Sequence, residues 1–200
     1  SGGLRRWRQR RRLLGNKLEL VEKVRVSRQQ LVDLLELLEL LEALGGKRAS
    51  SPAEVGEVAD AVFIMVMTGK QAESIVSGED GLLKTMNPGK TILLTATIEP
   101  HEARSIGKTV AKKGVHLIDA PVSGGQNGAE SGTLALMAAA DKEVWDENLD
   151  LMKAVGENIF HVGEEIGIGQ TVKASLQALI GCTFTAIFES LVLGSKAGVS

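Results

Sequence analysis

Residues 91–125, TILLTATIEPHEARSIGKTVAKKGVHLIDAPVSGG, contain the pattern that determines the fold. The apolar runs at 91–97 and 115–120 have the composition of strands that are buried on both faces. Between them, residues 101–113 follow the spacing of an amphipathic helix, and Gly114 ends it. A strand, a helix and a second strand at this spacing predict a βαβ unit with parallel strands.

The same alternation continues on both sides of this unit. A helix is expected to begin at Pro52, with Ser51 as its cap. The further elements that we expect are strands at 61–67, 133–139 and 158–162, helices at 71–76 and 142–155, and a turn at 87–89. Together these elements predict an α/β fold with a mostly parallel, doubly wound sheet. Ligands of such sheets bind at the carboxyl ends of the strands, which here are the segments 67–69, 95–97 and 121–125.

The last segment, 167–199, is one long helical pattern. It is apolar from Leu176 to Gly194 apart from Gln177, Glu189 and small hydroxyl residues. Its length would suit a membrane span, but the polar side chains would be costly in lipid. We therefore expect no membrane association. The apolar face instead predicts a helix buried between domains or subunits, and self-association through 167–199.

The composition is that of a soluble globular chain: 200 residues, 44% hydrophobic, with a net charge of −2. The lone cysteine, Cys182, excludes an internal disulfide framework and a zinc site built on several cysteines. A reducing compartment fits this usage, so we expect an intracellular protein, cytoplasmic or organellar. The aromatic content of 3% disfavours a stacking platform for single-stranded nucleic acid.

The small net charge hides an uneven distribution. Residues 1–48 hold twelve Lys/Arg against six Asp/Glu, a charge of +6, and the remaining 152 residues carry −8. An Arg-rich start around Trp7 is followed by a Leu- and Glu-rich helical pattern at 29–44. The Arg-rich start fits a solvated terminus best, and nucleic-acid binding through it is the less favoured alternative.

The segment 119–125, DAPVSGG, follows a predicted strand directly. Its small residues and glycines allow the backbone to approach a ligand closely. The N–H groups of Ser123, Gly124 and Gly125, together with the Ser123 hydroxyl, could hold a carboxylate. A plain turn is the alternative, since Pro and Gly are common in turns.

The segment 167–173, GIGQTVK, opens the long helix. Val172 occupies the third glycine position of a dinucleotide fingerprint, so that interpretation fails. Partial burial of Lys173 would lower its pKa and suit it to proton transfer. Gln177 lies four residues later on the same helix face. The alternative is a lysine that extends to solvent.

In order and spacing, FIMVMT, TILLTATIEP, GVHLIDAPVSGG and GIGQTVKASLQ closely resemble the β-hydroxyacid dehydrogenases, the family of 3-hydroxyisobutyrate dehydrogenase. The resemblance runs from about Gly45 to Ser200. It implies a Rossmann-like fold of the 6-phosphogluconate dehydrogenase type. It also implies an oxidoreductase that passes hydride from the hydroxyl carbon of a small hydroxy acid to NADP or NAD.

The resemblance implies roles for particular residues. Lys173 would donate and accept the proton at the substrate oxygen. The substrate carboxylate would be bound by Ser123, Gly124 and Gly125. The remaining matched positions, on the cofactor side, are Met67, Thr68 and Thr97.

Three departures from the family pattern concern the substrate. Ala96 stands where many members have a serine, and Gln177 replaces the usual asparagine. Glutamine at that position is similar to the branch that acts on threonate-like acids, although Leu176 replaces the histidine of that branch. The resemblance therefore implies a 3-hydroxyisobutyrate- or threonate-like substrate.

The resemblance also implies a division of the chain. Residues 1–46 form an atypical basic and Leu-rich helical segment where the family has its GxGxxG unit. The second half of a Rossmann-like domain then covers 47–163, and 164–200 is a long interdomain helix that begins a truncated C-terminal domain. We therefore expect this chain alone to bind NAD(P) weakly and to turn over slowly or not at all. The alternative functions are a non-enzymatic interaction module and a truncated or frame-shifted gene product.

Overall fold

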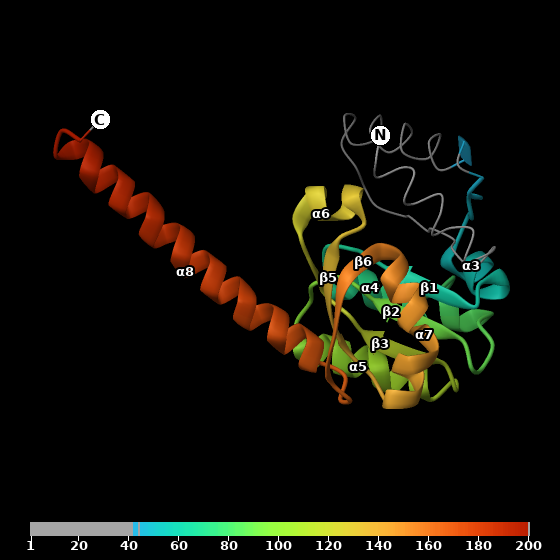
Figure 1. Ribbon diagram of the computed structural model, residues 1–200. Coiled ribbons are helices and arrows are strands. Elements are labelled where there is room, and N and C mark those ends of the chain that lie inside the picture. The colour runs from blue at the N-terminus through green and yellow to red at the C-terminus, as the bar shows by residue number, and fades with distance from the viewer. Residues whose placement is uncertain (1–41, 44, 200) are drawn as a thin grey trace.

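The computed structural model describes residues 42–43 and 45–199 (Figure 1). The Arg-rich start and nearly all of the predicted helix at 29–44 lie outside these residues. From residue 52 onward, helices and strands alternate along the chain. The elements are α3 (Pro52–Val58), β1 (Ala61–Ile64), α4 (Gly69–Ser77), the 3-10 helix η1 (Leu82–Lys84), β2 (Thr91–Leu94), α5 (Pro100–Ala111), β3 (His116–Asp119), β4 (Val122–Ser123), α6 (Gly125–Ser131), β5 (Leu134–Ala139), α7 (Lys142–Val155), β6 (Gly156–Gly163) and α8 (Ile168–Lys196).

Within the described residues, six strands form one sheet. Five follow the order β1-β2-β3-β5-β4, and β6 also pairs with β5. The pairs β1–β2, β2–β3 and β5–β6 are parallel, which confirms the predicted α/β fold with a mostly parallel sheet. The pairs β3–β5 and β4–β5 are antiparallel. The sequence did not predict this reversal, which places β5 and β6 opposite in direction to β1, β2 and β3.

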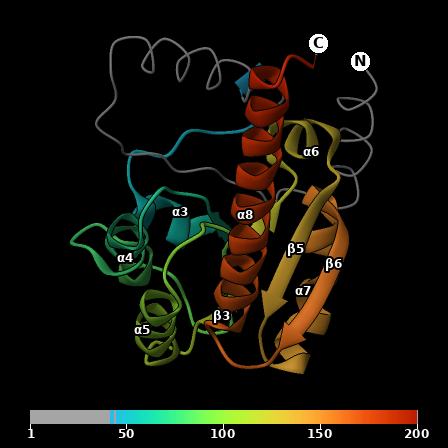
Figure 2. The same cartoon turned by 90° about the vertical axis from the view of Figure 1, so that its left-hand side faces the viewer.

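Helices cover both faces of the sheet, as Figure 2 shows for α4 and α5 on one side and α7 on the other. Alternate residues of a strand point to opposite faces, so β2 contributes to two separate cores. Ile92 and Leu94 pack in the core beneath α3, α4 and α5. Leu93 packs in the second core with Trp145 and Met152 of α7. Because β2 is buried on both faces, its sequence is a continuous apolar run rather than an alternating one.

Two of the predicted strands are shorter than expected. The runs at 61–67 and 91–97 pair only as far as Ile64 and Leu94. Beyond these points the chain leaves the ladder, and the N–H groups of Thr95 and Ala96 both donate to the Ile64 carbonyl. The residues after Ile64 and after Leu94 therefore lie at the carboxyl-terminal edge of the sheet, which we call its rim.

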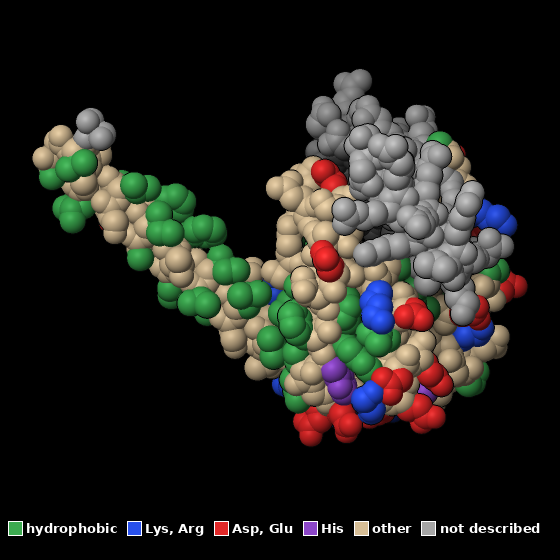
Figure 3. All heavy atoms as spheres, viewed as in Figure 1, with side chains coloured by type: hydrophobic (Ala, Val, Ile, Leu, Met, Phe, Trp, Pro, Cys, Tyr) green, Lys and Arg blue, Asp and Glu red, His purple; other side chains and the backbone are tan. Residues whose placement is uncertain are grey.

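Helix α8 extends away from the rest of the described chain (Figure 1). Its buried residues are Gly169, Gln170 and Lys173, all in its first two turns. Hydrophobic side chains are spread over the remainder (Figure 3). Leu191, for example, is 65% exposed. Burial of this helix between domains or subunits thus stays a prediction.

Among the described residues, α8 is also long and apolar enough to cross a membrane by length and composition alone. Core helices of soluble proteins meet the same criterion. The expected lack of membrane association is therefore still a prediction.

Candidate active site

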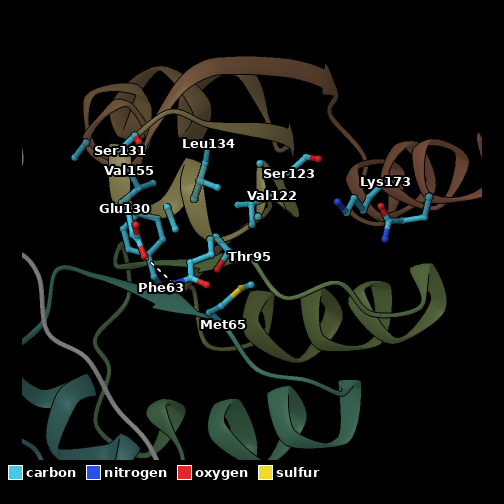
Figure 4. A pocket seen from close by; sticks show the side chains of 17 residues that line it. Phe63, Met65, Thr95, Val122, Ser123, Glu130, Ser131, Leu134, Val155 and Lys173 are labelled. Carbon is cyan, nitrogen blue, oxygen red and sulfur yellow. Dashed lines mark hydrogen bonds between the residues drawn. The ribbon is translucent and has the colours of Figure 1, made fainter. Parts of the chain in front are cut away.

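A cavity of about 860 Å³ lies between the rim of the sheet, the β4–α6 segment and the start of α8 (Figure 4). It brings together all five residues that the sequence predicted on the substrate side: Ser123, Gly124, Gly125, Lys173 and Gln177. These residues come from two segments about fifty positions apart in the chain. The structure therefore brings these residues together, and their role in substrate binding stays a prediction.

The glycines of the β4–α6 segment have backbone conformations that favour glycine. Gly124 has φ +133 and Gly125 has φ +59. A Cβ at Gly125 would meet no atom within 4 Å, so its backbone faces open space. The Ser123 hydroxyl and the Lys173 ammonium group point toward the same space from opposite sides (Figure 4). A small ligand between them would contact both groups.

Lys173 is buried, with only 6% of its surface exposed. Its Nζ makes no hydrogen bond or ion pair with any residue that the structure describes. Burial lowers the pKa of Lys173 below its usual value of 10.5, because the charged form loses hydration. The alternative of a lysine extended into solvent therefore does not hold, and the neutral amine is available at lower pH than in an exposed lysine.

A buried polar cluster fixes the start of α8 beside this lysine. Asp119, at the end of β3, accepts hydrogen bonds from the backbone N–H of Gly167 at 2.8 Å and of Gln170 at 3.2 Å. The side-chain amide of Gln170 donates to Asp119 Oδ1 at 2.8 Å. Burial raises the pKa of Asp119, and these hydrogen bonds oppose the rise.

Sequence reasoning assigned no role to Asp119, Gly169 or Gln170. The available signals were an acidic residue at the end of a buried strand and two glycines just before a helix. A Cβ at Gly169 would lie 2.5 Å from the carbonyl oxygen of Asp119 and 2.6 Å from that of Met137. The helix can therefore approach the sheet this closely only with glycine at that position.

The three residues predicted on the cofactor side do not line the cavity. Met67 is 84% exposed, and Thr97 is exposed after β2. Thr68 caps α4 in a capping box with Gln71. The same loops contribute Met65 and Thr95 to the cavity instead, two positions before Met67 and Thr97 respectively.

The carboxyl end of β1 nevertheless suits a nucleotide. Met65 and Met67 are 66% and 84% exposed there, at the place where doubly wound sheets bind their ligands. The sequence contains no GxGxxG, and the cofactor-side roles of Met67, Thr68 and Thr97 stay predictions.

The fold and the cavity together define an α/β domain of the doubly wound, nucleotide-binding class with a helix-borne lysine. A family model described as the NAD binding domain of 6-phosphogluconate dehydrogenase matches residues 24–163. The chain belongs to this family, and the resemblance to the β-hydroxyacid dehydrogenases is confirmed. The match begins inside the segment 1–46, and the division of the chain at residue 46 stays a prediction.

Known relatives have the names expected for this family. An L-threonate dehydrogenase from Cupriavidus necator is 34% identical over 155 residues, which are 78% of this chain and 52% of the relative. For a 2-hydroxy-3-oxopropionate reductase from Escherichia coli the identity is 38%, over 78% of this chain and 53% of the relative. The chain thus spans about half the length of the curated relatives that it matches.

A solved structure supports the fold. The 3-hydroxyisobutyrate dehydrogenase from Salmonella typhimurium superposes with a TM-score of 0.75 at 27% identity. The superposition covers 99% of this chain and 66% of that one. The Rossmann-like architecture is therefore shared with a structurally characterised member of the group.

Proposed function

We propose that this protein is an oxidoreductase that acts on the hydroxyl carbon of a small hydroxy acid with NADP or NAD. The observation that carries the proposal is the position of Lys173. The Lys173 side chain is largely buried, its pKa is lowered, and it lines one cavity with Ser123, Gly124 and Gly125. A proton-transfer group opposite an anion-binding loop is the arrangement that oxidation of a hydroxy acid needs.

Each cavity residue has a role in this proposal. The neutral Lys173 Nζ accepts the hydroxyl proton as the carbinol carbon is oxidised to a carbonyl, and it returns the proton in the reverse reaction. The Ser123 hydroxyl and the N–H groups of Gly124 and Gly125 bind the substrate carboxylate. When bound, the nicotinamide cofactor supplies the hydride acceptor.

The cofactor side of the site comes from the loops after β1 and β2. Met67, Thr68 and Thr97 would contact the nicotinamide nucleotide from the rim of the sheet. Their exposure leaves them accessible to a ligand that lies over the carboxyl ends of the strands.

The substrate is proposed to be 3-hydroxyisobutyrate- or threonate-like. Gln177 lines the cavity one helical turn beyond Lys173. Its amide carries both a donor and an acceptor, which suits an additional hydroxyl of a four-carbon sugar acid. The names of the C. necator and S. typhimurium relatives agree with these two substrate classes.

A homo-oligomer and an intracellular location, cytoplasmic or organellar, complete the proposal. Exposed apolar side chains continue along α8 well beyond its buried start. A second copy of the chain would remove this surface from water. The alternative of an interaction module receives no support from the relatives, and its Arg-rich segment lies outside the described residues.

Ligand binding tests the proposal even if turnover is slow. We expect NADP or NAD together with 3-hydroxyisobutyrate or L-threonate to shift the backbone amide resonances of Ser123, Gly124 and Gly125 and the titration of Lys173. Any NADPH or NADH formed should disappear in Lys173→Met and persist in Lys142→Met. Lys142 is a suitable control because it is exposed and pairs with Asp146 on α7.

The contradicting outcome is equally clear. If saturating cofactor and both acids leave the 123–125 amides and Lys173 unchanged, no hydroxy-acid site exists at this cavity.

A further inference from the structure

Gln170 connects three elements of the active site through one side chain. Its Oε1 accepts a hydrogen bond from the Ile98 N–H at 3.0 Å. Its Nε2 donates to the Ala96 carbonyl at 3.0 Å and to Asp119 Oδ1 at 2.8 Å. The partners lie in the loop after β2 and at the end of β3, and Gln170 itself lies in the first turn of α8. Both N–H groups of the amide and one lone pair of its oxygen are thus directed at these two strand ends.

Asp119 completes the same junction from the sheet. Besides the Gln170 amide, its carboxylate accepts the backbone N–H groups of Gly167 and Gln170. These N–H groups belong to the start of a helix, where they have no partner within the helix itself. The carboxylate therefore satisfies the first turn of α8 and holds it against β3. Asp119 is fully buried, so water does not compete for these bonds.

Helix α8 also contacts β5, β6 and α5, but few of its side chains are buried. Gln170 and Lys173 are its only buried side chains among the described residues, and Gly169 packs directly on backbone carbonyls. The position of Lys173 is therefore set by the turn that precedes it. That turn is held by Asp119 and Gln170.

We propose that Asp119 and Gln170 are positioning residues that lock the first turn of α8 onto β2 and β3 and thereby hold Lys173 opposite Ser123. The proposal rests on the proposed function only for the role of Lys173. Neither residue lines the cavity, so both act through Lys173 rather than on the substrate. The junction also fixes the loops that carry Thr97 and Ser123 relative to the lysine.

The test compares two buried amides. Gln170→Met removes the junction with little change in side-chain size. Asn148→Leu makes the equivalent change on α7, where Asn148 is buried and donates to Val144 O at 2.8 Å. Asp119→Asn is the third variant. Each full-length protein is labelled with ¹³Cε-lysine, Lys173 is assigned by its loss in Lys173→Met, and amide hydrogen exchange is recorded in parallel.

We expect Gln170→Met to speed exchange at the Ile98 amide by about tenfold or more, the effect of losing one buried hydrogen bond. Asp119→Asn should speed exchange at the Gly167 and Gln170 amides or at Ile98, because its one oxygen cannot accept from both the backbone N–H groups and Gln170 Nε2, and its NH₂ faces a donor in either orientation. In both variants the Lys173 titration should move toward its ordinary value as the amine gains water. Asn148→Leu should lower the melting temperature and leave the Lys173 titration as it is in the parent protein.

The proposal is overturned if Gln170→Met folds and Lys173 titrates as in the parent protein. It is also overturned if Asn148→Leu shifts Lys173 as much as Gln170→Met does, since the effect would then be general loosening. If Asp119→Asn does not fold, Gln170→Met decides alone, because it leaves Asp119 bonded to both backbone amides. None of these measurements needs cofactor or turnover. Failure of hydroxy-acid binding would therefore refute the proposed function and leave this result standing.

Discussion

The Asp119 carboxylate accepts two hydrogen bonds from Gln170, one from its backbone N–H and one from its side-chain amide, although the two residues are 51 positions apart. One residue ends a central strand and the other begins the helix that carries Lys173. The chemistry proposed for the cavity therefore depends on a contact between the sheet and α8 that lies outside the cavity itself.

Asp119→Ala should destabilise the protein strongly. It leaves the N–H groups of Gly167 and Gln170 and the Gln170 amide without their acceptor, at a cost of about 3 kcal/mol or more in unfolding free energy. Urea unfolding measures the loss. Asp150→Ala is the control, because Asp150 is 93% exposed and its removal should cost less than about 1 kcal/mol. Equal losses in the two variants would contradict the structural role of Asp119.

Two glycines of α8 should respond in opposite directions to alanine. In Gly169→Ala the new Cβ would meet the carbonyl oxygens of Asp119 and Met137, so the helix must move away at a cost of about 1–3 kcal/mol. In Gly181→Ala the Cβ meets nothing within 4 Å, and helix propensity should stabilise the protein by about 0.5–1 kcal/mol. Thermal unfolding distinguishes the two. If Gly169→Ala is more stable than the parent protein, α8 does not pack against the carbonyl oxygens of Asp119 and Met137 as described.

The stability of the protein should depend on pH through Lys173. Its folded-state pKa is lowered by burial, so below pH 10.5 the unfolded chain binds the proton more tightly than the folded chain does. The unfolding free energy should therefore rise with pH between the lowered pKa and 10.5, and the Lys173 contribution is flat below that window. Urea unfolding across this range should show the rise in the parent protein. Lys173→Met should lack that component, and an identical pH profile in both would exclude burial of the amine.

The exposed face of α8 should drive self-association. Phe188→Glu introduces a charge among apolar side chains, of which Phe184 and Leu191 are the nearest in helical spacing. We expect the parent chain to be larger than a monomer by light scattering and Phe188→Glu to be a monomer. Ser190→Glu is the matched control, because position 190 is also exposed and lies, two residues from Phe188, on the opposite side of the helix. A parent chain that is monomeric at all concentrations would contradict the proposed oligomer.

The sequence was sufficient for those parts of the structure that depend on local pattern. Apolar runs and helical spacing predicted the alternation of strands and helices, and the substrate-side residues from Ser123 to Gln177 were found together in one cavity. The reversal at β5 was missed, because strand direction depends on how the short β4–α6 segment folds back. Helix α6 was also missed, since Gly, Gln and Asn have little helical signal.

The residues on the cofactor side show a different limit of prediction from the sequence. Apolar character continues past Ile64, so the sequence pattern does not reveal where pairing in β1 stops. The true strand end brings Met65 rather than Met67 to the cavity. The Asp119–Gln170 contact was missed for another reason, because hydrogen bonding between distant positions has no local signature in a single sequence.

The shape of α8 has a mechanical consequence. The helix has 29 residues, a length of about 43 Å at 1.5 Å per residue, and within the part of the chain that the structure describes it is buried only in its first two turns. A rotation of α8 about the contact between Asp119 and Gln170 is therefore amplified along the helix. Because the helix has this length, a tilt of about 5° at this contact moves its C-terminal end by about 4 Å. Conversely, a partner surface that binds the C-terminal end of α8 restricts the orientation of the helix at Lys173 more strongly than a contact near its first turn does.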